Sequence, residues 1–220
     1  MSISLAVEGK YACFSRPEFK VERTSYDVMT PSAARGLLEA IYWHPGVAWR
    51  IDRIRVCSPI RFCSVRRNEL ASKIHAKTAK TVMTRGGGPL YLDRTKDIQQ
   101  RASLLLRDVS YIVDAHFDLT EKAAATDNPG KIQDIITRRI RKGQCFHQPY
   151  FGCREFPAEF REFIGDFTCP KELLGDVDLG WMLYDMDYSE PGNIRPRFFR
   201  GRLCNGVMEI PAWNSEEVRG

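Results

Sequence analysis

The stretch Tyr111-Ile-Val-Asp-Ala-His-Phe-Asp-Leu119 alternates between two kinds of side chain. Every second residue from Tyr111 to Leu119 is apolar, and the positions between them include Asp114, His116 and Asp118. Because successive side chains of a strand point to opposite faces of a sheet, this pattern predicts a strand with one buried and one polar face. The alternation makes this strand the best-defined element of the chain.

The segments on either side of this strand alternate between strand and helix signals. Thr30 followed by Pro31 is typical of a helix start, because the hydroxyl caps free amides and proline suits the first turn. Ile132, Ile135 and Ile136 form an apolar stripe at helical spacing after Pro129. The expected order is strand 3–14, helix 31–41, strands 49–56 and 60–65, strand 104–119, helix 129–143 and strand 144–155.

This order approximates the β-α-β-β-α-β ferredoxin-like unit, which is also the RNA-recognition (RRM) topology. We therefore predict an α+β protein with a ferredoxin-like domain at residues 1–155. Residues 156–220 are expected to form a small antiparallel β subdomain with a strand at 179–187 and a hairpin at 198–210. The dipeptide Asn205-Gly206 is the turn signal of that hairpin.

Positive charge is concentrated in the middle of the chain. The 220 residues carry a formal net charge of +5, yet residues 50–101 alone contain 13 basic and four acidic side chains. Such a segment favours a polyanionic partner, and its arginines and interleaved aromatic residues favour nucleic acid. A solvated basic face that only maintains solubility is the alternative. The polar, glycine-containing segment 67–100 is predicted to be a mobile basic arm inserted into the first domain.

Several function classes lack their sequence signals. Neither the Walker pattern nor the dinucleotide-binding glycine pattern occurs, and the seven cysteines include no C-x-x-C pair. No apolar run reaches the roughly 18 residues of a membrane span, and no basic-then-apolar leader is visible. We expect a soluble cytoplasmic protein without cofactor or metal. Paired aspartates at 176 and 178, and at 185 and 187, could hold Mg²⁺, but surface carboxylates are the favoured interpretation.

Five blocks of sequence resemble one known family. The chain resembles the type I-C (Dvulg) CRISPR-associated RAMP endoribonucleases, subfamily d of the Cas-five family. The blocks follow the family order from about residue 5 to 210. They are Lys20 to Met29, Pro31 to Trp43, Arg66-Arg67-Asn68-Glu69, Val113 to Leu119 and Gln148 to Pro157.

This resemblance implies a function. Members of the family bind the stem-loop of CRISPR repeat RNA, cleave it on its 3′ side without metal, and keep the guide RNA 5′ end in the surveillance complex. The implied partners are repeat and guide RNA, the backbone and large subunits of a type I-C complex, and also target DNA. The alternative within the same complex is a non-catalytic subunit that only caps the guide RNA.

The resemblance also implies a catalytic pair, Tyr42 and His116. We expect His116 to act as a general acid, because Asp114 and Asp118 beside it favour its protonated form. The alternative is a surface histidine that these two carboxylates merely satisfy. Tyr42 is expected to orient the attacking 2′-hydroxyl, with aromatic packing beside Trp43 as the alternative.

One departure from the family concerns charge. Relatives carry a lysine near the strand histidine, whereas this chain has Asp114 close to that place. The cation that stabilises the phosphorane must then come from elsewhere, with Arg35, Lys77 and Lys122 as candidates. The residues that we expect to contact RNA are Arg35, Arg66, Arg67, Lys73, Lys77, Lys80, Arg138, Arg139 and Arg141.

Overall fold

The strand that the alternation predicts at 104–119 is longer in the structure and forms the centre of the sheet. A computed structural model describes residues 2–19, 21–190 and 192–220. In it β5 spans Ile98–Leu119. Its C-terminal half pairs antiparallel with β1 (Ser2–Ala12) and β3 (Val47–Val56), and its N-terminal half pairs with β4 (Phe62–Leu70). Four apolar residues of its alternation, Tyr111, Val113, Ala115 and Phe117, are buried, which confirms the predicted core face as far as Phe117, whereas Leu119 at the end of the strand is exposed.

The described strands form one nine-stranded sheet in the order β6-β1-β5-β3-β9-β8-β7, with β2 and β4 also paired to β5. In the β1-α1-β3-β5-α3-β6 series, the strands lie side by side as fourth, first, third and second. The C-terminal strands continue the same sheet, because β9 pairs with β3. The remaining strands are β2 (Arg23–Thr24), β6 (Glu159–Glu162), β7 (Asp176–Asp187), β8 (Arg195–Cys204) and β9 (Val207–Glu209).

The two helices that the sequence predicted are present, and both cover one face of the sheet. The hydroxyl of Thr30 accepts a hydrogen bond from the amide of Ala33 at the start of α1 (Pro31–Ile41). Asn128 caps α3 (Pro129–Arg141) in the same way. Both helices pack their apolar stripes into the core cluster that includes Val113 of β5. The polar face of β5 therefore points away from the helices.

The strand predicted at 144–155 is wrong, because these residues form a loop with isolated contacts. Gly152 has a φ of +77°, a conformation that interrupts a pleated strand. A Cβ at this position would lie 2.0 Å from the carbonyl oxygen of Cys13, so the loop packs too closely for a larger residue. The strand that pairs with β1 on this side is β6, which begins at Glu159.

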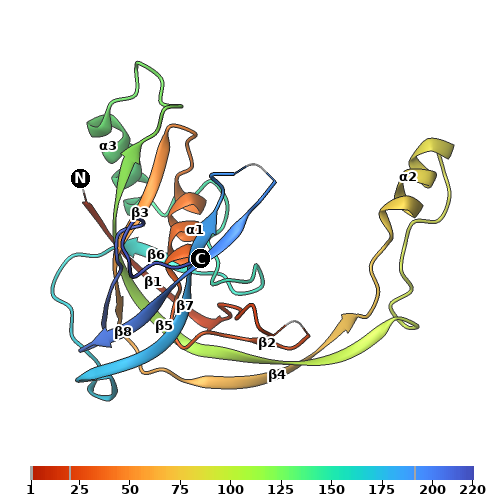
Figure 1. Cartoon of the computed structure of the whole chain (residues 1–220), viewed down its shortest axis with the longest axis horizontal. Helices are drawn as coiled ribbons and strands as arrows, with labels where there is room; N and C mark the ends of the chain where they lie inside the picture. Colours follow the sequence, from red (N-terminus) through yellow and green to blue (C-terminus); the bar gives the residue numbers. More distant parts are fainter. Residues whose placement is uncertain (1, 20, 191) are drawn as a thin grey trace.

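The arm (residues 67–100) contains more regular secondary structure than the sequence predicted. β4 and the first half of β5 form a long ribbon that leads away from the body, and α2 (Ala76–Arg85) lies at its far end (Figure 1). The helix ends at Gly86, whose φ of 68° closes the last turn. None of its residues is buried. No described helix is both long and apolar enough to cross a membrane.

Candidate functional site

A β-bulge in β3 turns the carboxylate of Asp52 toward His116. The register shifts between Ile51 and Arg53, so Asp52 is the extra residue opposite β5. Oδ1 of Asp52 lies 2.7 Å from Nδ1 of His116, and the two side chains are 43% and 41% exposed. Because Nδ1 is engaged by a carboxylate, Nε2 is the ring nitrogen available to a substrate. Bulges of this kind often re-aim side chains beside active sites.

The carboxylates that flank His116 in the sequence have other partners. Asp114 accepts hydrogen bonds from Arg53 and Arg55, with shortest N–O distances of 2.7 and 2.5 Å. Asp118 accepts one from Nε of Arg50 at 3.1 Å. The carboxylate hydrogen-bonded to His116 is therefore that of Asp52, and not one of the two, Asp114 and Asp118, on which both interpretations of the sequence relied. No local sequence pattern indicates the bulge that brings Asp52 there.

Asp114 is buried within this cluster and presents little charge to the surface. Its side chain is 8% exposed, and Oγ of Ser4 donates a fourth hydrogen bond to it at 2.6 Å, after one from Arg53 and two from Arg55. Burial alone would raise the pKa of Asp114, but the hydrogen bonds from Arg55, Ser4 and Arg53 lower it overall. Asp114 is therefore an ionised structural group that binds arginines, rather than a free anion facing RNA.

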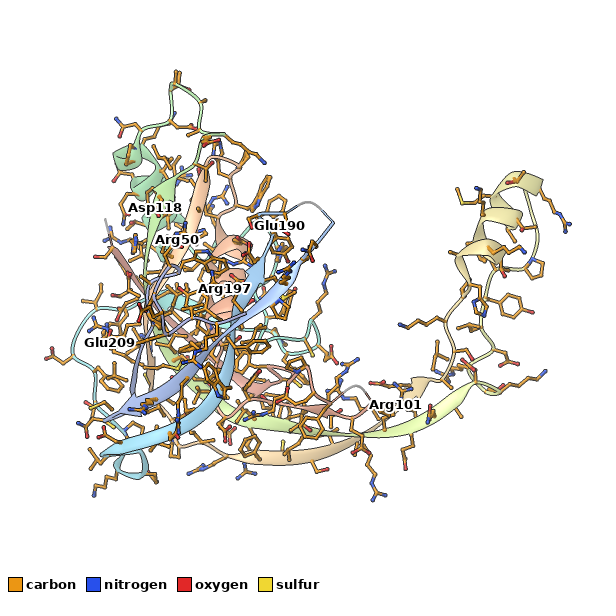
Figure 2. The ribbon with its side chains drawn as sticks, in the orientation of Figure 1. Arg50, Arg101, Asp118, Glu190, Arg197 and Glu209 are labelled. Atoms are coloured by element: carbon orange, nitrogen blue, oxygen red, sulfur yellow. The ribbon has the colours of Figure 1, made fainter. Side chains whose placement is uncertain are left out.

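Arg50 lies opposite His116 on the neighbouring strand. The two residues are direct partners in the β3–β5 register. Its side chain is 48% exposed and lies beside Asp118 at the same end of these strands (Figure 2). Its terminal amino groups have no hydrogen bond within the described chain. Of the three sequence candidates, Arg35 lies on the helix side, Lys77 on α2 of the arm, and Lys122 in the turn that follows β5.

Tyr42 lies on the opposite side of the sheet from His116. It caps the C-terminus of α1, is 8% exposed, and belongs to the core cluster between the helices and the sheet. The guanidinium of Arg139 lies 5.2 Å from its ring, and its carbonyl accepts a hydrogen bond from Trp49. Burial raises the pKa of Tyr42, so its phenol stays protonated at neutral pH. The structure does not bring the predicted catalytic pair together.

The residues expected to contact RNA fall into two groups. One group is exposed and makes no ion pair within the described chain. Four of its members belong to the arm and its base, where no acidic residue neutralises them. This group consists of Arg66, Lys73, Lys77, Lys80 and Arg138.

The second group already serves the fold. Arg67 contacts Glu155 and lies 5.0 Å from the ring of Phe156, and Arg139 donates to the carbonyl of Ile41 at 2.7 Å. Arg141 makes two hydrogen bonds to Glu162. Arg35 is enclosed by carboxylates on two sides, as described below. Sequence alone does not distinguish such arginines from exposed ones.

One aspartate of each pair considered for Mg²⁺ is engaged by an arginine. Arg200 lowers the pKa of Asp178 to about 2, and Asp185 binds Arg35. Within the described residues, no group of three or more His, Cys, Asp or Glu side chains is placed to hold a metal ion.

Comparison with known proteins places the chain in a family. The sequence profile described as CRISPR-associated protein (Cas_Cas5) matches residues 2–211. A protein of Mannheimia succiniciproducens, named CRISPR pre-crRNA endoribonuclease Cas5d, is 49% identical over 99% of this chain and 98% of its own length. The chain belongs to the Cas5d family. A Cas5d protein of Thermus thermophilus with the same name is 40% identical, over 98% of this chain and 94% of its own.

Solved structures share the fold at lower sequence identity. A structure titled as a CRISPR-associated protein has a TM-score of 0.72 and 23% identity, and covers 100% of this Cas5d-family chain and 97% of its own. A chain from a structure titled CRISPR RNA-guided surveillance complex has a TM-score of 0.56 and 15% identity, with 96% and 92% coverage. These similarities show a common fold.

Proposed function

We propose that this chain is an endoribonuclease that cuts CRISPR repeat RNA and then stays bound to the 5′ end of the guide RNA in a type I-C surveillance complex. The two relatives that carry the name pre-crRNA endoribonuclease align with nearly the whole chain, which supports this assignment. The observation that carries the catalytic part is the exposed imidazole of His116, held at Nδ1 by Asp52.

The proposed chemistry needs no metal. The 2′-hydroxyl oxygen of the RNA attacks the adjacent phosphorus and the bond to the 5′ oxygen breaks. The products are a 2′,3′-cyclic phosphate and a 5′-hydroxyl. Protonated His116 donates its Nε2 proton to the departing 5′ oxygen, while water or a second group accepts the 2′ proton. Asp52 keeps the imidazole oriented with Nε2 outward.

Arg50 supplies the positive charge that the phosphorane requires. It is the register partner of His116, and its terminal amino groups remain available. Preorganised cations at the point where negative charge develops are a large source of catalytic power. Because Asp114 is buried and paired with Arg53 and Arg55, its negative charge does not oppose this role.

RNA binding is assigned to the exposed basic residues of the arm and to Arg138 of α3. Residues 71–97 contain six basic and two acidic side chains, and none of the α2 residues is buried. Exposed lysines and arginines bind phosphates by releasing counterions. The arm can therefore engage an RNA backbone without disturbing the protein core.

We further infer that the β1-α1-β3-β5-α3-β6 unit is the ferredoxin-like RAMP domain. Its elements follow one another as β-α-β-β-α-β, and its strands lie side by side in the order β6-β1-β5-β3. The same proposal includes contacts with the backbone and large subunits of the complex and with target DNA. It also includes a cytoplasmic location. A second candidate is a non-catalytic subunit that caps guide RNA. The separation of Tyr42 from His116 favours that candidate.

The test is incubation of the purified protein with its own repeat RNA in excess EDTA. We expect cleavage that survives EDTA and stops when the scissile nucleotide lacks its 2′-hydroxyl. RNA that is bound tightly and stays intact would favour the capping function. Cleavage that requires added Mg²⁺ would contradict the mechanism through the 2′-hydroxyl.

A further inference from the structure

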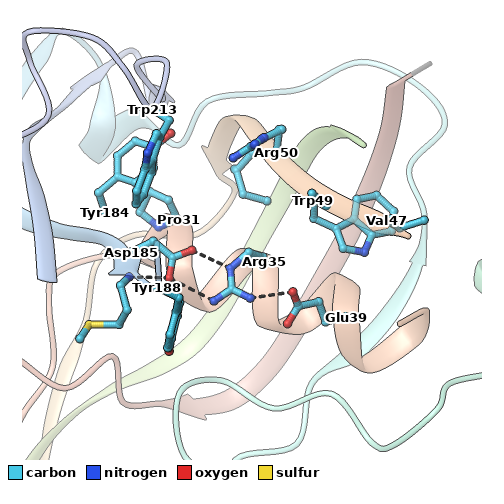
Figure 3. Close-up of a pocket in the computed structure, with 13 residues that line it drawn as sticks. Pro31, Arg35, Glu39, Val47, Trp49, Arg50, Tyr184, Asp185, Tyr188 and Trp213 are labelled. Atoms are coloured by element: carbon cyan, nitrogen blue, oxygen red, sulfur yellow. Dashed lines mark hydrogen bonds and ion pairs between the residues drawn. The ribbon is translucent and has the colours of Figure 1, made fainter. Parts of the chain in front are cut away.

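A pocket of about 320 Å³ opens at the uncovered end of β3, between α1 and the end of β7 (Figure 3). β9 pairs with β3 only from Arg53 to Arg55, and the amide of Ile210 donates to the carbonyl of Asp52, so residues 47–51 of β3 form a free edge. Aromatic side chains make much of the wall. They are Trp49 of β3, Tyr184 of β7, Tyr188 just after β7 and Trp213 near the C-terminus.

The base of the pocket is held rigid by an ion-pair cluster. Nε of Arg35 donates to Asp185 at 2.6 Å, and Nη1 donates to Glu39 at 2.6 Å, as the dashed lines of Figure 3 show. Trp213 is fixed by an edge-to-face contact with Tyr184, whose ring centroid lies 5.5 Å away. These contacts preorganise the wall before any ligand arrives.

Three polar groups of the lining retain unused hydrogen-bonding capacity within the described chain. Glu39 accepts through Oε1, which leaves Oε2 without a partner. The hydroxyl of Tyr188 makes no hydrogen bond, and this side chain is 64% exposed. Arg50 uses only Nε, for Asp118. The pocket therefore offers a carboxylate acceptor, a guanidinium donor and a hydroxyl around an aromatic wall.

The pocket lies next to the candidate active site. Arg50 lines it and is the register partner of His116. The charges of Arg50 and Asp52 both act on the hydroxyl of Tyr184, whose pKa is raised mainly by burial. A strand whose phosphate reaches His116 would thus pass the mouth of the pocket.

We propose that this pocket binds one unstacked nucleobase of the RNA strand, next to the phosphate at His116, and selects a base that carries an exocyclic amine. This inference rests on the proposed function, because it takes RNA as the ligand. Sequence-specific RNA recognition commonly uses splayed bases that stack on aromatic side chains and hydrogen-bond through their edges. The free carboxylate oxygen of Glu39 accepts an amine hydrogen from adenine, cytosine or guanine. Uracil has a carbonyl oxygen in place of the amine, and its N3–H donor is flanked by two carbonyl oxygens that the carboxylate repels.

The test measures binding of repeat RNAs that each lack one base. Binding is measured in the His116→Ala protein so that no RNA is cleaved. We expect one abasic position to weaken binding by about 5- to 100-fold, as loss of one stacked base does. In a protein that also carries Tyr188→Ala, the same abasic position should change binding by less than about twofold. Leu174→Ala, at a 61% exposed position outside the pocket, is the matched control.

Glu39→Gln tests the edge of the base. Its amide oxygen can still accept from Arg35, but its amino group now faces the ligand as a donor. At the abasic position that weakens binding, RNA with uracil should bind worse than RNA with the natural base in the His116→Ala protein. In a protein that also carries Glu39→Gln, the RNA with uracil should bind about equally well or better. The inference would be overturned if, at every position, removal of the base weakened binding equally in the proteins with and without Tyr188→Ala. If the unaltered protein does not cleave its repeat RNA, the proposed endoribonuclease function is refuted, but the inference about base binding is not.

Discussion

The imidazole of His116 meets the carboxylate of Asp52 across the β5–β3 pair, with 2.7 Å between Nδ1 and Oδ1. The bulge at Asp52 creates this relationship, because it adds one residue to β3 and shifts Arg53 onto Asp114. The hydrogen bond orients the ring and leaves Nε2 facing outward. The oriented, exposed imidazole can protonate a departing oxygen. Arg50, its partner in the strand register, can stabilise the negative charge of the transition state.

Replacement of His116 by alanine removes the proposed proton donor. We expect the single-turnover cleavage rate to fall by about 10²- to 10⁴-fold, the usual contribution of general acid catalysis. RNA affinity should change by less than about twofold, because the arm that binds phosphates is untouched. Gel-based cleavage and fluorescence anisotropy measure the two quantities. His147→Ala, at an exposed position in the loop after α3, is the control, and an undiminished rate in His116→Ala would exclude His116 from the mechanism.

Replacement of Asp52 by asparagine keeps the shape of the side chain and removes its charge. We expect the cleavage rate to fall by roughly 10- to 100-fold, because a poorly oriented imidazole loses alignment with the 5′ oxygen. The dissociation constant for RNA should not change. Asp134→Asn, on the exposed side of α3, should behave as the unaltered protein. A rate equal to that of the unaltered protein would show that His116 needs no partner.

The core of the fold was predictable because its signals are local. The alternation of β5, the Thr30-Pro31 start of α1, the Pro129 start of α3 and the Asn205-Gly206 turn are each encoded within a few residues, and the structure confirms them. The strand predicted at 144–155 failed because Gly152 adopts a positive φ, which the sequence does not reveal. The helix in the arm was missed because its stability does not come from burial. The division into domains at residue 155 stays a prediction.

The candidate site was only half predictable, because it depends on strand register. His116 was identified from sequence, but its partner Asp52 and its neighbour Arg50 come from another strand. A one-residue bulge decides which side chains of β3 face it. The same limit applies to the arginines, since only tertiary structure shows that Arg35 and Arg139 are already bound.

Asp114 gives the protein a pH-dependent contribution to stability. Its pKa is lowered in the folded state, so its ionised form stabilises the fold above the ordinary range of aspartate, near pH 4. That stabilisation is lost as the pH falls through the lowered pKa. Asp114→Asn should reduce the free energy of unfolding at pH 7 by about 3 kcal/mol, because it leaves Arg55 buried without its partner.

Thermal or urea unfolding between pH 7 and pH 3 checks the Asp114 prediction. The difference between the unaltered protein and Asp114→Asn should be largest at neutral pH and shrink in acid. A difference that is the same at every pH would show that the cluster acts through packing rather than charge. Asp134→Asn is again the control, since its carboxylate is exposed.

Two substitutions of Tyr42 distinguish a packing role from a catalytic one. Tyr42→Ala removes a buried ring beneath Arg139 and should lower the free energy of unfolding by roughly 3 kcal/mol. Tyr42→Phe keeps the ring, and its stability should lie within about 0.5 kcal/mol of the unaltered protein. Urea unfolding tests both values. If Tyr42→Phe is stable but no longer cleaves RNA, the phenol hydroxyl orients the attacking 2′-hydroxyl of the RNA. If Tyr42→Phe cleaves RNA as fast as the unaltered protein, Tyr42 contributes only packing.

The arm should contribute to RNA affinity without contributing to stability. Lys77 and Lys80 are exposed on α2 and make no ion pair within the described chain, so the Lys77→Ala/Lys80→Ala protein should unfold at the same temperature as the unaltered one. Each phosphate contact adds about 0.7 to 0.9 to the slope of log affinity against log salt concentration. The double variant should therefore lower that slope by about 1.4 to 1.8, measured by anisotropy between 50 and 300 mM KCl, roughly the range in which such slopes are linear. Lys171→Ala, in the short 3₁₀ helix Lys171–Leu173, should leave the slope unchanged. An unchanged slope in the double variant would mean that α2 does not contact RNA phosphates, because removing two bound cations must alter counterion release whatever the RNA sequence.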